Sequence, residues 1–342
     1  MRAAHLPPTP GGAVTAGEER DARMVLAAVS EPADVITSTL IARVGAVSTV
    51  ELIANRLSLP SDIDTAEGEL WRRRLAPRIH PDELDQQRAA MDAANLRVLT
   101  PADADWPTEL NQLGSTAPIA LWLHGAPESL HAPLPGRVTI TGAQAATAYG
   151  SHLARELAAD LSRRGRVILA GSSHGIDADA HFGALAAGPT ATIAVLASGL
   201  GRPQSAGHDD FHERIASGGG LLISELPPGA SPTRWRFLQR GRLLAALAGS
   251  TVVVEAGRRS ASLNVAAIAH ALGRPVAALP GPLTSPTSAG THALIQSGTA
   301  TLITGADDLI RLTDPAVRYA VDRPFATANP HRGLPDGRRR LR

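Results

Sequence analysis

The amino-acid sequence predicts an α/β fold in which a doubly wound, mostly parallel sheet follows a small N-terminal helical module. The first observation is a strand–helix–strand pattern: β-branched residues fill 138–141, leucines recur at every fourth position over 153–161, and an apolar run covers 167–170. Such a unit is right-handed and has parallel strands. The second observation is that strand and helix patterns keep alternating up to about residue 312.

Composition limits the possible functions. The 342 residues are 44% hydrophobic, which is enough for a sizeable core. The chain has no cysteine, which excludes disulfides, thiolate metal sites and cysteine nucleophiles, and it has no lysine, which excludes a P-loop. The net charge is only +1, so any nucleic-acid site must come from local clustering of arginines. We find no uncharged apolar stretch of roughly 18 to 20 residues, and we expect a cytoplasmic protein.

Four segments are predicted. Residues 1–17 are rich in Pro and Gly and are predicted to be disordered, and residues 18–95 form the helical module, with helices over 18–29, 33–44, 49–57 and 65–94. Residues 96–312 form the α/β domain, which has an extra strand at 119–123 and two tryptophans, Trp106 and Trp122, that we predict to be core anchors. Residues 313–342 are predicted to be a flexible basic tail.

The α/β pattern after the central unit defines further elements. Strands are expected at 192–197, 221–224, 251–255, 276–279 and 301–303. Helices are expected at 208–216, 237–247, 262–272 and 289–295. In an open parallel sheet, ligands bind beyond the carboxyl ends of the strands, where helix N-termini hold anions. Phosphate is therefore the first ligand to consider.

Two glycine-containing loops follow the first two parallel strands. Residues 142–147, Gly-Ala-Gln-Ala-Ala-Thr, lack two of the three glycines of the dinucleotide fingerprint, so an NAD or FAD enzyme is not expected. Residues 171–175, Gly-Ser-Ser-His-Gly, match the G-x-S-x-G pattern of a hydrolase elbow, and Asp209 or Asp210 with His212, His270 or His292 would complete a triad on paper. A hydrolase needs more strands before the elbow, so we prefer an anion-binding loop.

In that interpretation, Gly171 and Gly175 let backbone N–H groups approach an anion, and Ser172 and Ser173 add hydroxyl donors. Asp177, Asp179 and His181 follow, and a metal site is one interpretation of them. We prefer acids that stabilise a helix start, face away from phosphate, and have a packed or hydrogen-bonded histidine behind them.

The densest basic cluster lies at 233–242. Four arginines and two aromatic residues occur there without an intervening acid: Arg234, Trp235, Arg236, Phe237, Arg240 and Arg242. This combination is typical of phosphate pairing with stacking on an unpaired base. The alternative is a solvated helix face with Trp235 or Phe237 in the core.

Several spaced motifs occur between about 97 and 312. They are Thr147-x-Tyr149-Gly150; Gly175-Ile176-Asp177-x-x-Ala180-His181; Ser224-Glu225-x-Pro227-Pro228-Gly229; Phe237-x-x-Arg240-x-Arg242; Val254-Glu255-Ala256 with Ser260-x-Ser262-Leu263; Leu279-Pro280-Gly281; and Ser288-x-Gly290-x-x-x-Leu294-Ile295. Together they resemble the DNA-processing protein A (DprA/Smf) family. The resemblance implies an extended Rossmann-like domain after a helical (SAM-like) module, single-stranded DNA binding without sequence preference, a homodimer, and a role in loading RecA during natural transformation.

The chain departs from the family pattern at several positions. The usual Gly-Ser-Arg turn is Gly142-Ala143-Gln144, Arg-Asn-Arg is Arg240-Gly241-Arg242, and Ser-Gly-Ser-Leu is 260–263, Ser-Ala-Ser-Leu. We expect that the winged-helix domain of many members does not fit into the residues after 312. Because of these departures, we expect altered or weaker DNA binding.

The sequence therefore predicts a DNA-binding protein that is not an enzyme and has no cofactor, catalytic residue or metal. The predicted DNA and phosphate site comprises Gly142, Gln144, Gly171, Ser172, Ser173, Gly175, Arg234, Phe237, Arg240, Arg242, Ser260, Ser262, Ser288 and Gly290. The alternatives are a nucleotide-binding sensor or nucleotide hydrolase on the same fold, whose relatives carry a Pro-Gly-Gly-x-Gly-Thr-x-x-Glu loop that is absent here, and a degenerate paralogue kept for partner interaction.

Overall fold

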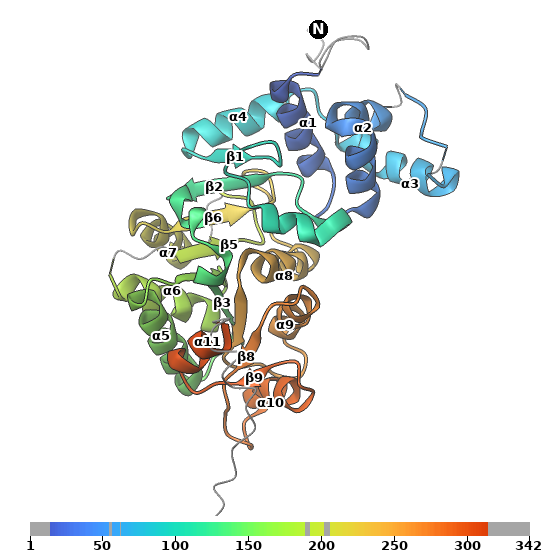
Figure 1. Cartoon of the computed structure of the whole chain (residues 1–342). Helices are drawn as coiled ribbons and strands as arrows, with labels where there is room; N and C mark the ends of the chain where they lie inside the picture. The colour runs from blue at the N-terminus through green and yellow to red at the C-terminus, as the bar shows by residue number, and fades with distance from the viewer. Residues whose placement is uncertain (1–13, 55–56, 62, 189–191, 202–205, 314–342) are drawn as a thin grey trace, which may run out of the picture.

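The computed structural model describes residues 14–54, 57–61, 63–188, 192–201 and 206–313 (Figure 1). Within them, nine strands form one mixed sheet. In sheet order they are β1 (Arg97–Leu99), β2 (Leu121–Gly125), β6 (Leu221–Ser224), β5 (Thr192–Val195), β4 (Val167–Gly171), β3 (Arg137–Thr141), β7 (Ser250–Val253), β8 (Val276–Ala278) and β9 (Thr301–Leu302). The strands from β6 to β9 are parallel, whereas β1 with β2 and β2 with β6 are antiparallel. The predicted doubly wound, mostly parallel sheet is confirmed.

The strand order places a topological switch point between β3 and β7. From β3 the chain adds β4, β5 and β6 on one side, then returns to add β7, β8 and β9 on the other. Thr139 pairs with Leu169 of β4 and with Thr251 of β7, so both neighbours are aligned on β3. In such sheets the crevice beyond the carboxyl ends at the switch point is the usual ligand site.

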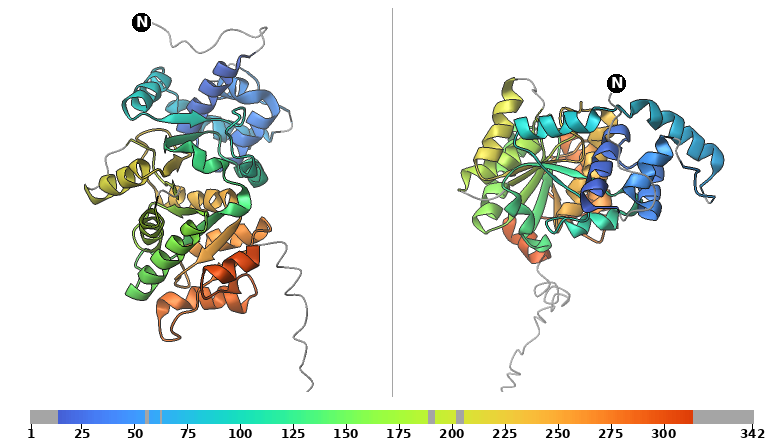
Figure 2. Two further views of the ribbon diagram at one scale, coloured as in Figure 1. Left: turned by 60° about the vertical axis from the view of Figure 1, so that its left-hand side comes forward. Right: turned by 90° about the horizontal axis from the view of Figure 1, so that it is seen from above.

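Helices cover both faces of the sheet (Figures 1 and 2). On one face lie α5 (Ala148–Arg163), α6 (Ile176–Ala186) and α11 (Ala306–Thr313), whose apolar residues pack against Ile140 and Ile168. On the other lie α8 (Arg234–Leu247), α9 (Ala261–Ala271) and α10 (Ala289–Gln296), which pack against Leu169 and Val253. Helix α7 (Ala206–Ser217) packs beside β2 and β6. Short 3₁₀ turns are η1 (Ala76–Arg78), η2 (Thr108–Thr116), η3 (Pro127–His131), η4 (Leu134–Gly136) and η5 (Pro286–Ser288).

The helical module comprises α1 (Ala16–Val29), α2 (Val35–Ile53), α3 (Thr65–Leu75) and α4 (Glu83–Ala93). Thr15 and Glu18 form a capping box, so α1 begins inside the segment predicted to be disordered. The single helix predicted over 65–94 is wrong, because prolines at 77 and 81 cannot continue a helix and separate α3 from α4. Residues 1–13 and the tail beyond 313 lie outside the described residues.

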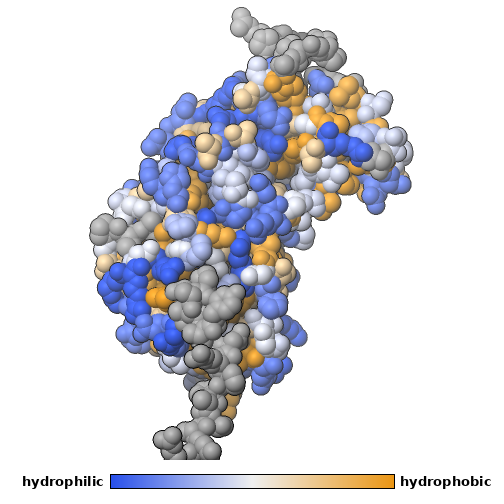
Figure 3. Space-filling view, in the orientation of Figure 1, coloured by the Kyte–Doolittle hydropathy of each residue, from blue (hydrophilic) through white to orange (hydrophobic). Residues whose placement is uncertain are grey.

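Helix α2 is long and apolar enough to cross a membrane by length and composition. Its backbone leaves helical geometry at Gly45 (φ 84°, ψ 165°), so it consists of two shorter helices, in rough agreement with the predicted pair. Both halves contribute buried residues, Leu40 and Val50 among them, to one core with Trp71. Figure 3 shows hydrophobic and hydrophilic residues interspersed over this face of the module. We therefore assign α2 to the core of the module.

The strands of the α/β domain lie close to their predicted positions, and 221–224 matches β6 residue for residue. Trp106 and Trp122 are 4% and 0% exposed, which confirms them as core anchors. The sequence pattern missed β1 and α11. Each is short and lies at the margin of the domain, where few apolar positions reveal the periodicity.

Candidate nucleic-acid interface

Three loops meet at the carboxyl edge of the sheet, around the switch point. They are 142–147 after β3, 171–175 after β4 and 254–260 after β7. A Cβ on Gly142 would lie 2.7 Å from the Glu255 carbonyl oxygen, and a Cβ on Gly175 would lie 2.2 Å from that of Gln144. Gly175 also has φ 78°, and the N–H of Ile176 donates to the Ala143 carbonyl at 3.1 Å. The three loops therefore form one packed surface that depends on glycines at the contacts.

A buried carboxylate fixes the loop after β7 to the start of α5. Glu255 is 3% exposed and accepts hydrogen bonds from the Thr147 N–H (3.0 Å), the Thr147 hydroxyl (2.6 Å) and the Thr287 hydroxyl (3.2 Å). Thr147 in turn caps α5 by accepting from the Gly150 N–H at 3.1 Å. A Cβ on Gly150 would lie 2.2 Å from Glu255 Oε2, so the carboxylate fits there because this residue is glycine.

A buried ion pair lies under the loop 171–175. Arg240 Nη2 is 3.5 Å from Asp177 Oδ2, and Arg240 Nη1 donates to the Val195 carbonyl at 3.3 Å. Burial raises the pKa of Asp177, while Arg240 and the Thr141 hydroxyl act in the opposite direction, and burial lowers the pKa of Arg240. A Cβ on Gly171 would overlap the Arg240 guanidinium. The glycine therefore makes room for this pair beneath the loop.

The start of α8 lies at the same edge, because α8 follows β6. The Thr233 hydroxyl caps the helix by accepting from the Arg236 N–H at 3.1 Å. Arg234 is exposed, and Phe237 is half-buried with the Arg240 guanidinium carbon 4.7 Å from its ring centroid. Trp235 is 50% exposed. One end of α8 thus presents a cation and aromatic surface to solvent.

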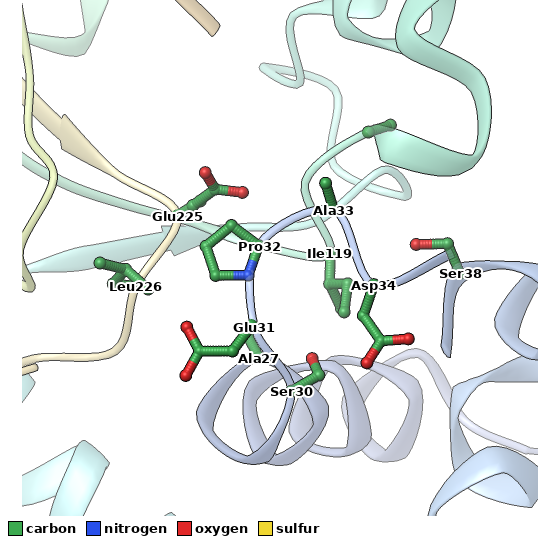
Figure 4. Close-up of a pocket in the computed structure, with 11 residues that line it drawn as sticks. Ala27, Ser30, Glu31, Pro32, Ala33, Asp34, Ser38, Ile119, Glu225 and Leu226 are labelled. Atoms are coloured by element: carbon green, nitrogen blue, oxygen red, sulfur yellow. The ribbon is translucent and has the colours of Figure 1, made fainter. Parts of the chain in front are cut away.

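The helical module holds this end of α8. The Trp235 Nε1–H donates to the Pro32 carbonyl at 3.2 Å, and Arg236 makes a two-point ion pair with Glu31. Figure 4 shows the turn that carries Glu31 and Pro32 beside Glu225 and Leu226 of the chain after β6. The cavity between them is only about 10 Å³, which is at most the space for one water molecule. The contact is therefore closely packed.

Arg242 is buried five positions after Phe237 on α8. Its guanidinium is paired with both oxygens of Glu225, and it donates to the Thr116 carbonyl at 2.6 Å and the Gln239 carbonyl at 2.9 Å. Both charged side chains are less than one-tenth exposed. The Arg242 guanidinium therefore makes its hydrogen bonds to other atoms of the protein.

Comparisons with known proteins show which family the chain belongs to. Residues 97–314 match the family model described as DNA recombination-mediator protein A. The chain is similar to a DNA processing protein DprA of Mycobacterium tuberculosis H37Rv, with 44% identity over 238 residues that cover 67% of this chain and 60% of that protein. It is also similar to protein Smf of Escherichia coli K12, with 35% identity over 228 residues that cover 66% of this chain and 59% of that protein. The chain belongs to the DNA recombination-mediator protein A (DprA/Smf) family.

Two solved structures of DprA proteins are similar to this chain. The Streptococcus pneumoniae protein gives a TM-score of 0.66 at 24% identity, covering 87% of this chain and 97% of that one. The Helicobacter pylori protein, whose study concerns its single-stranded DNA binding mode, gives a TM-score of 0.55 at 27% identity over 63% of this chain and 94% of that one. The chain spans about 60% of the length of the curated DprA/Smf relatives named above.

The structure divides the predicted DprA/Smf site residues by exposure. Gln144 and Arg234 are exposed, and Gly142, Ser172, Ser173, Gly175, Phe237 and Ser260 are partly exposed. Gly171, Arg240, Arg242, Ser262, Ser288 and Gly290 are buried. The exposed and partly exposed residues lie on the three loops and the starts of α8 and α9, so the structure brings them to one edge of the sheet.

The buried site residues contact other parts of the protein in this structure. Arg240 and Arg242, which are predicted to line the phosphate track, each face a buried carboxylate. The space beside Gly171, which is predicted to let an anion approach, holds the Arg240–Asp177 pair. The Gly290 N–H donates to the Ala256 carbonyl at 2.7 Å, so this residue supports the loop after β7 from below.

The three serines of the predicted neighbouring pocket differ in exposure. Ser260 Oγ and Ser262 Oγ hydrogen-bond to each other at 2.8 Å. Ser288 is 2% exposed, and a Cβ on Gly281 would lie 2.2 Å from its Oγ. Only Ser260 is partly exposed, so the pocket is a packed layer under the loop rather than an open lining.

The acids and the histidine of α6 have structural partners. His181 is buried between the Gly171 carbonyl (3.0 Å from Nε2) and the Thr192 hydroxyl (2.8 Å from Nδ1), which confirms the packed, hydrogen-bonded interpretation. Burial lowers its pKa to about 4. Asp179 pairs with Arg155. Asp177 is buried beneath the loop 171–175, where its carboxylate faces the Arg240 guanidinium.

Sequence reasoning missed two features of this edge. Arg258 and Arg259 are exposed on the loop after β7, and Arg236 is engaged by Glu31. The exposed pair Arg258 and Arg259 could have been predicted, because two adjacent arginines directly follow a predicted strand. No local pattern could have found the second, since the two partners are 205 positions apart.

Proposed function

We propose that this protein binds single-stranded DNA without sequence preference and acts as a recombination mediator. The observation that carries the proposal is the surface at the start of α8, where exposed Arg234 and the half-buried Phe237 ring lie at the same sheet edge as the loops 142–147 and 171–175. Arginine pairs with phosphate, and an aromatic ring stacks on any base. Neither interaction depends on the base sequence of the DNA.

Family membership supports the same proposal, because the matching family is that of recombination-mediator protein A. Support also comes from the H. pylori relative, whose structural study concerns its single-stranded DNA binding mode. We extend the proposal to partners by family resemblance: the protein forms a homodimer, loads RecA on DNA taken up in natural transformation, and works in the cytoplasm.

The proposal is tested by fluorescence anisotropy with a labelled oligonucleotide of mixed sequence and with the matching duplex, at several salt concentrations. We expect tighter binding to the single strand and a linear fall of log affinity with log salt, because arginine–phosphate pairing releases counterions. Equal affinity for the duplex, or affinity that does not change with salt, would overturn the proposal.

We propose further that the protein is not a hydrolase. His181 is the histidine packed behind the loop that carries Ser173, and its two ring nitrogens face Gly171 and Thr192. Among the described residues, no hydrogen bond joins the Ser173 hydroxyl to a histidine; the Asp209 side chain lies outside them. A fluorophosphonate probe should leave the purified protein unlabelled. Labelling that is lost in Ser173→Ala would revive the hydrolase.

The RecA extension has its own test. RecA is added to single-stranded DNA already coated with a single-strand binding protein, and its DNA-dependent ATP hydrolysis is followed with and without this protein. A shortened lag supports mediator activity. An unchanged lag together with tight DNA binding would restrict the function to DNA binding.

A further inference from the structure

We propose that the turn 257–260 after β7 carries two further phosphate contacts, Arg258 and Arg259, so that the DNA track crosses the topological switch point from α8 to the start of α9. This inference rests on the proposed single-stranded DNA binding. It places part of the binding site on a loop that lies outside the arginine cluster of α8.

The turn is built so that both arginines project outward. The Ser260 N–H donates to the Gly257 carbonyl at 3.0 Å, which closes a four-residue turn with Arg258 and Arg259 at its two central positions. Both are exposed. A Cβ on Gly257 would meet only the Pro286 carbonyl oxygen within 4 Å, at a van der Waals distance of 3.8 Å, so this end of the turn is not crowded.

The base of the turn is rigid. The Val254 N–H donates to the Thr141 carbonyl at 3.0 Å, and the Ala256 N–H donates to the Thr287 carbonyl at 2.7 Å. The carboxylate of Glu255, the acid next to the turn, is buried and engaged by Thr147 and Thr287. It therefore does not compete with phosphate for the arginines. No ion pair to Arg258 or Arg259 occurs in the part of the chain that the structure describes.

The turn leads directly into α9, which adds to the positive potential. Ser260 is the N-cap residue, but its side chain makes no capping hydrogen bond, and the first turn of α9 has no acidic residue. The helix dipole therefore reinforces the two arginines. The arginines provide the contact in this proposal, and the helix start adds to their field.

Helices α8 and α9 lie side by side on the same face of the sheet (Figure 1). A Cβ on Gly241 would lie 3.1 Å from Val265 Cγ2, so the two helices pack closely. Both helices start at the carboxyl edge of the sheet, because α8 follows the parallel strand β6 and α9 follows the parallel strand β7. Arg234 at the start of α8 and the arginine pair before α9 consequently lie along one edge, with the loop 142–147 beside them.

The test replaces both residues, Arg258→Ala with Arg259→Ala, and measures single-stranded DNA affinity against salt. For single strands, each phosphate contact contributes roughly 0.7 to the slope of log affinity against log salt. If each arginine holds one phosphate, the double alanine variant should therefore have a slope that is shallower by about 1.4. The charge-retaining pair Arg258→Lys with Arg259→Lys should keep most of the slope. Melting temperature should stay the same in both, since neither side chain has an ion pair in the described residues.

A matched control removes two adjacent arginines from the opposite edge. Arg163 is the last residue of α5 and Arg164 is its C-cap, just before β4 begins. Their side chains are 59% and 36% exposed and, unlike Arg258 and Arg259, they pair with Asp160. Arg163→Ala with Arg164→Ala should leave the salt slope unchanged. If the parent protein binds single-stranded DNA and the Arg258/Arg259 alanine pair binds it with the parent's slope, the inference is overturned and the proposed function stands. If the parent does not bind, both are overturned.

Discussion

The guanidinium of Arg236 forms a two-point ion pair with the carboxylate of Glu31, with Nε to Oε2 at 2.9 Å and Nη2 to Oε1 at 3.0 Å. This pair joins the helical module to the end of α8 that carries the proposed DNA contacts. Glu31 is also 3.6 Å from Arg78 of the module. One acid of the module therefore neutralises a cation at the border of the proposed track.

The first prediction concerns this pair. Glu31→Gln keeps the shape of the side chain and removes its charge, so Arg236 becomes available to phosphate. We expect severalfold tighter single-stranded DNA binding and a salt slope steeper by about 0.7. Glu128→Gln, at an exposed glutamate on η3, serves as the control. Weaker binding by Glu31→Gln would mean that the pair positions α8 for DNA instead of competing with it.

The second prediction assigns Arg242 to stability. Arg242→Ala leaves the Glu225 carboxylate buried without its partner, and breaking a buried pair in this way costs about 3 to 5 kcal/mol of folding free energy. Urea unfolding measures that loss. Arg234→Ala, which removes an exposed arginine, should change folding stability little and make the salt slope shallower by about 0.7. A stable Arg242→Ala protein with a shallower slope would restore the residue to the phosphate track.

The third prediction separates stacking from charge. Phe237→Leu should weaken single-stranded DNA binding by roughly 1 to 3 kcal/mol while leaving the salt slope unchanged, because the lost interaction is a ring on a base. The ring also contacts the Arg240 guanidinium, so melting temperature is measured in parallel. A fall in melting temperature with unchanged affinity would assign the ring to the core instead.

The fourth prediction concerns pH. Because burial lowers the pKa of His181 to about 4 from an ordinary value of 6.5, the unfolded chain takes up a proton below pH 6.5 that the folded protein excludes. The stabilising contribution is complete above pH 6.5 and is lost as pH falls to 4, by about 3 kcal/mol at 1.36 kcal/mol per pKa unit. Urea unfolding across this range should show the loss.

Two substitutions test the assignment of the pH effect. His181→Gln should remove the pH dependence attributed to this ring. His270→Gln, at an exposed histidine on α9, should leave it in place. If folding stability depends on pH in the same way in the parent, His181→Gln and His270→Gln, the titrating group is a residue other than His181.

Much of the fold followed from periodicity in the sequence. The β-branched run at 138–141 and the apolar run at 167–170 correspond to β3 and β4, and the alternation of strand and helix predicted the positions of the later strands along the chain. The carboxyl edge could also be located, because the connections of parallel strands place their following loops at one edge. The sequence alone therefore determined the fold class and the position of the candidate site.

The tertiary structure decided which arginines can reach a ligand. Arg234, Arg240 and Arg242 share one helix and one cluster in the sequence, yet Arg234 is exposed while the other two are buried against Asp177 and Glu225. Burying a guanidinium is costly unless a carboxylate meets it, and those carboxylates come from α6 and from the chain after β6. Packing between elements that are distant in the sequence brings these carboxylates to the arginines. The sequence could therefore identify the arginine cluster, but only the tertiary structure shows which of its members are exposed.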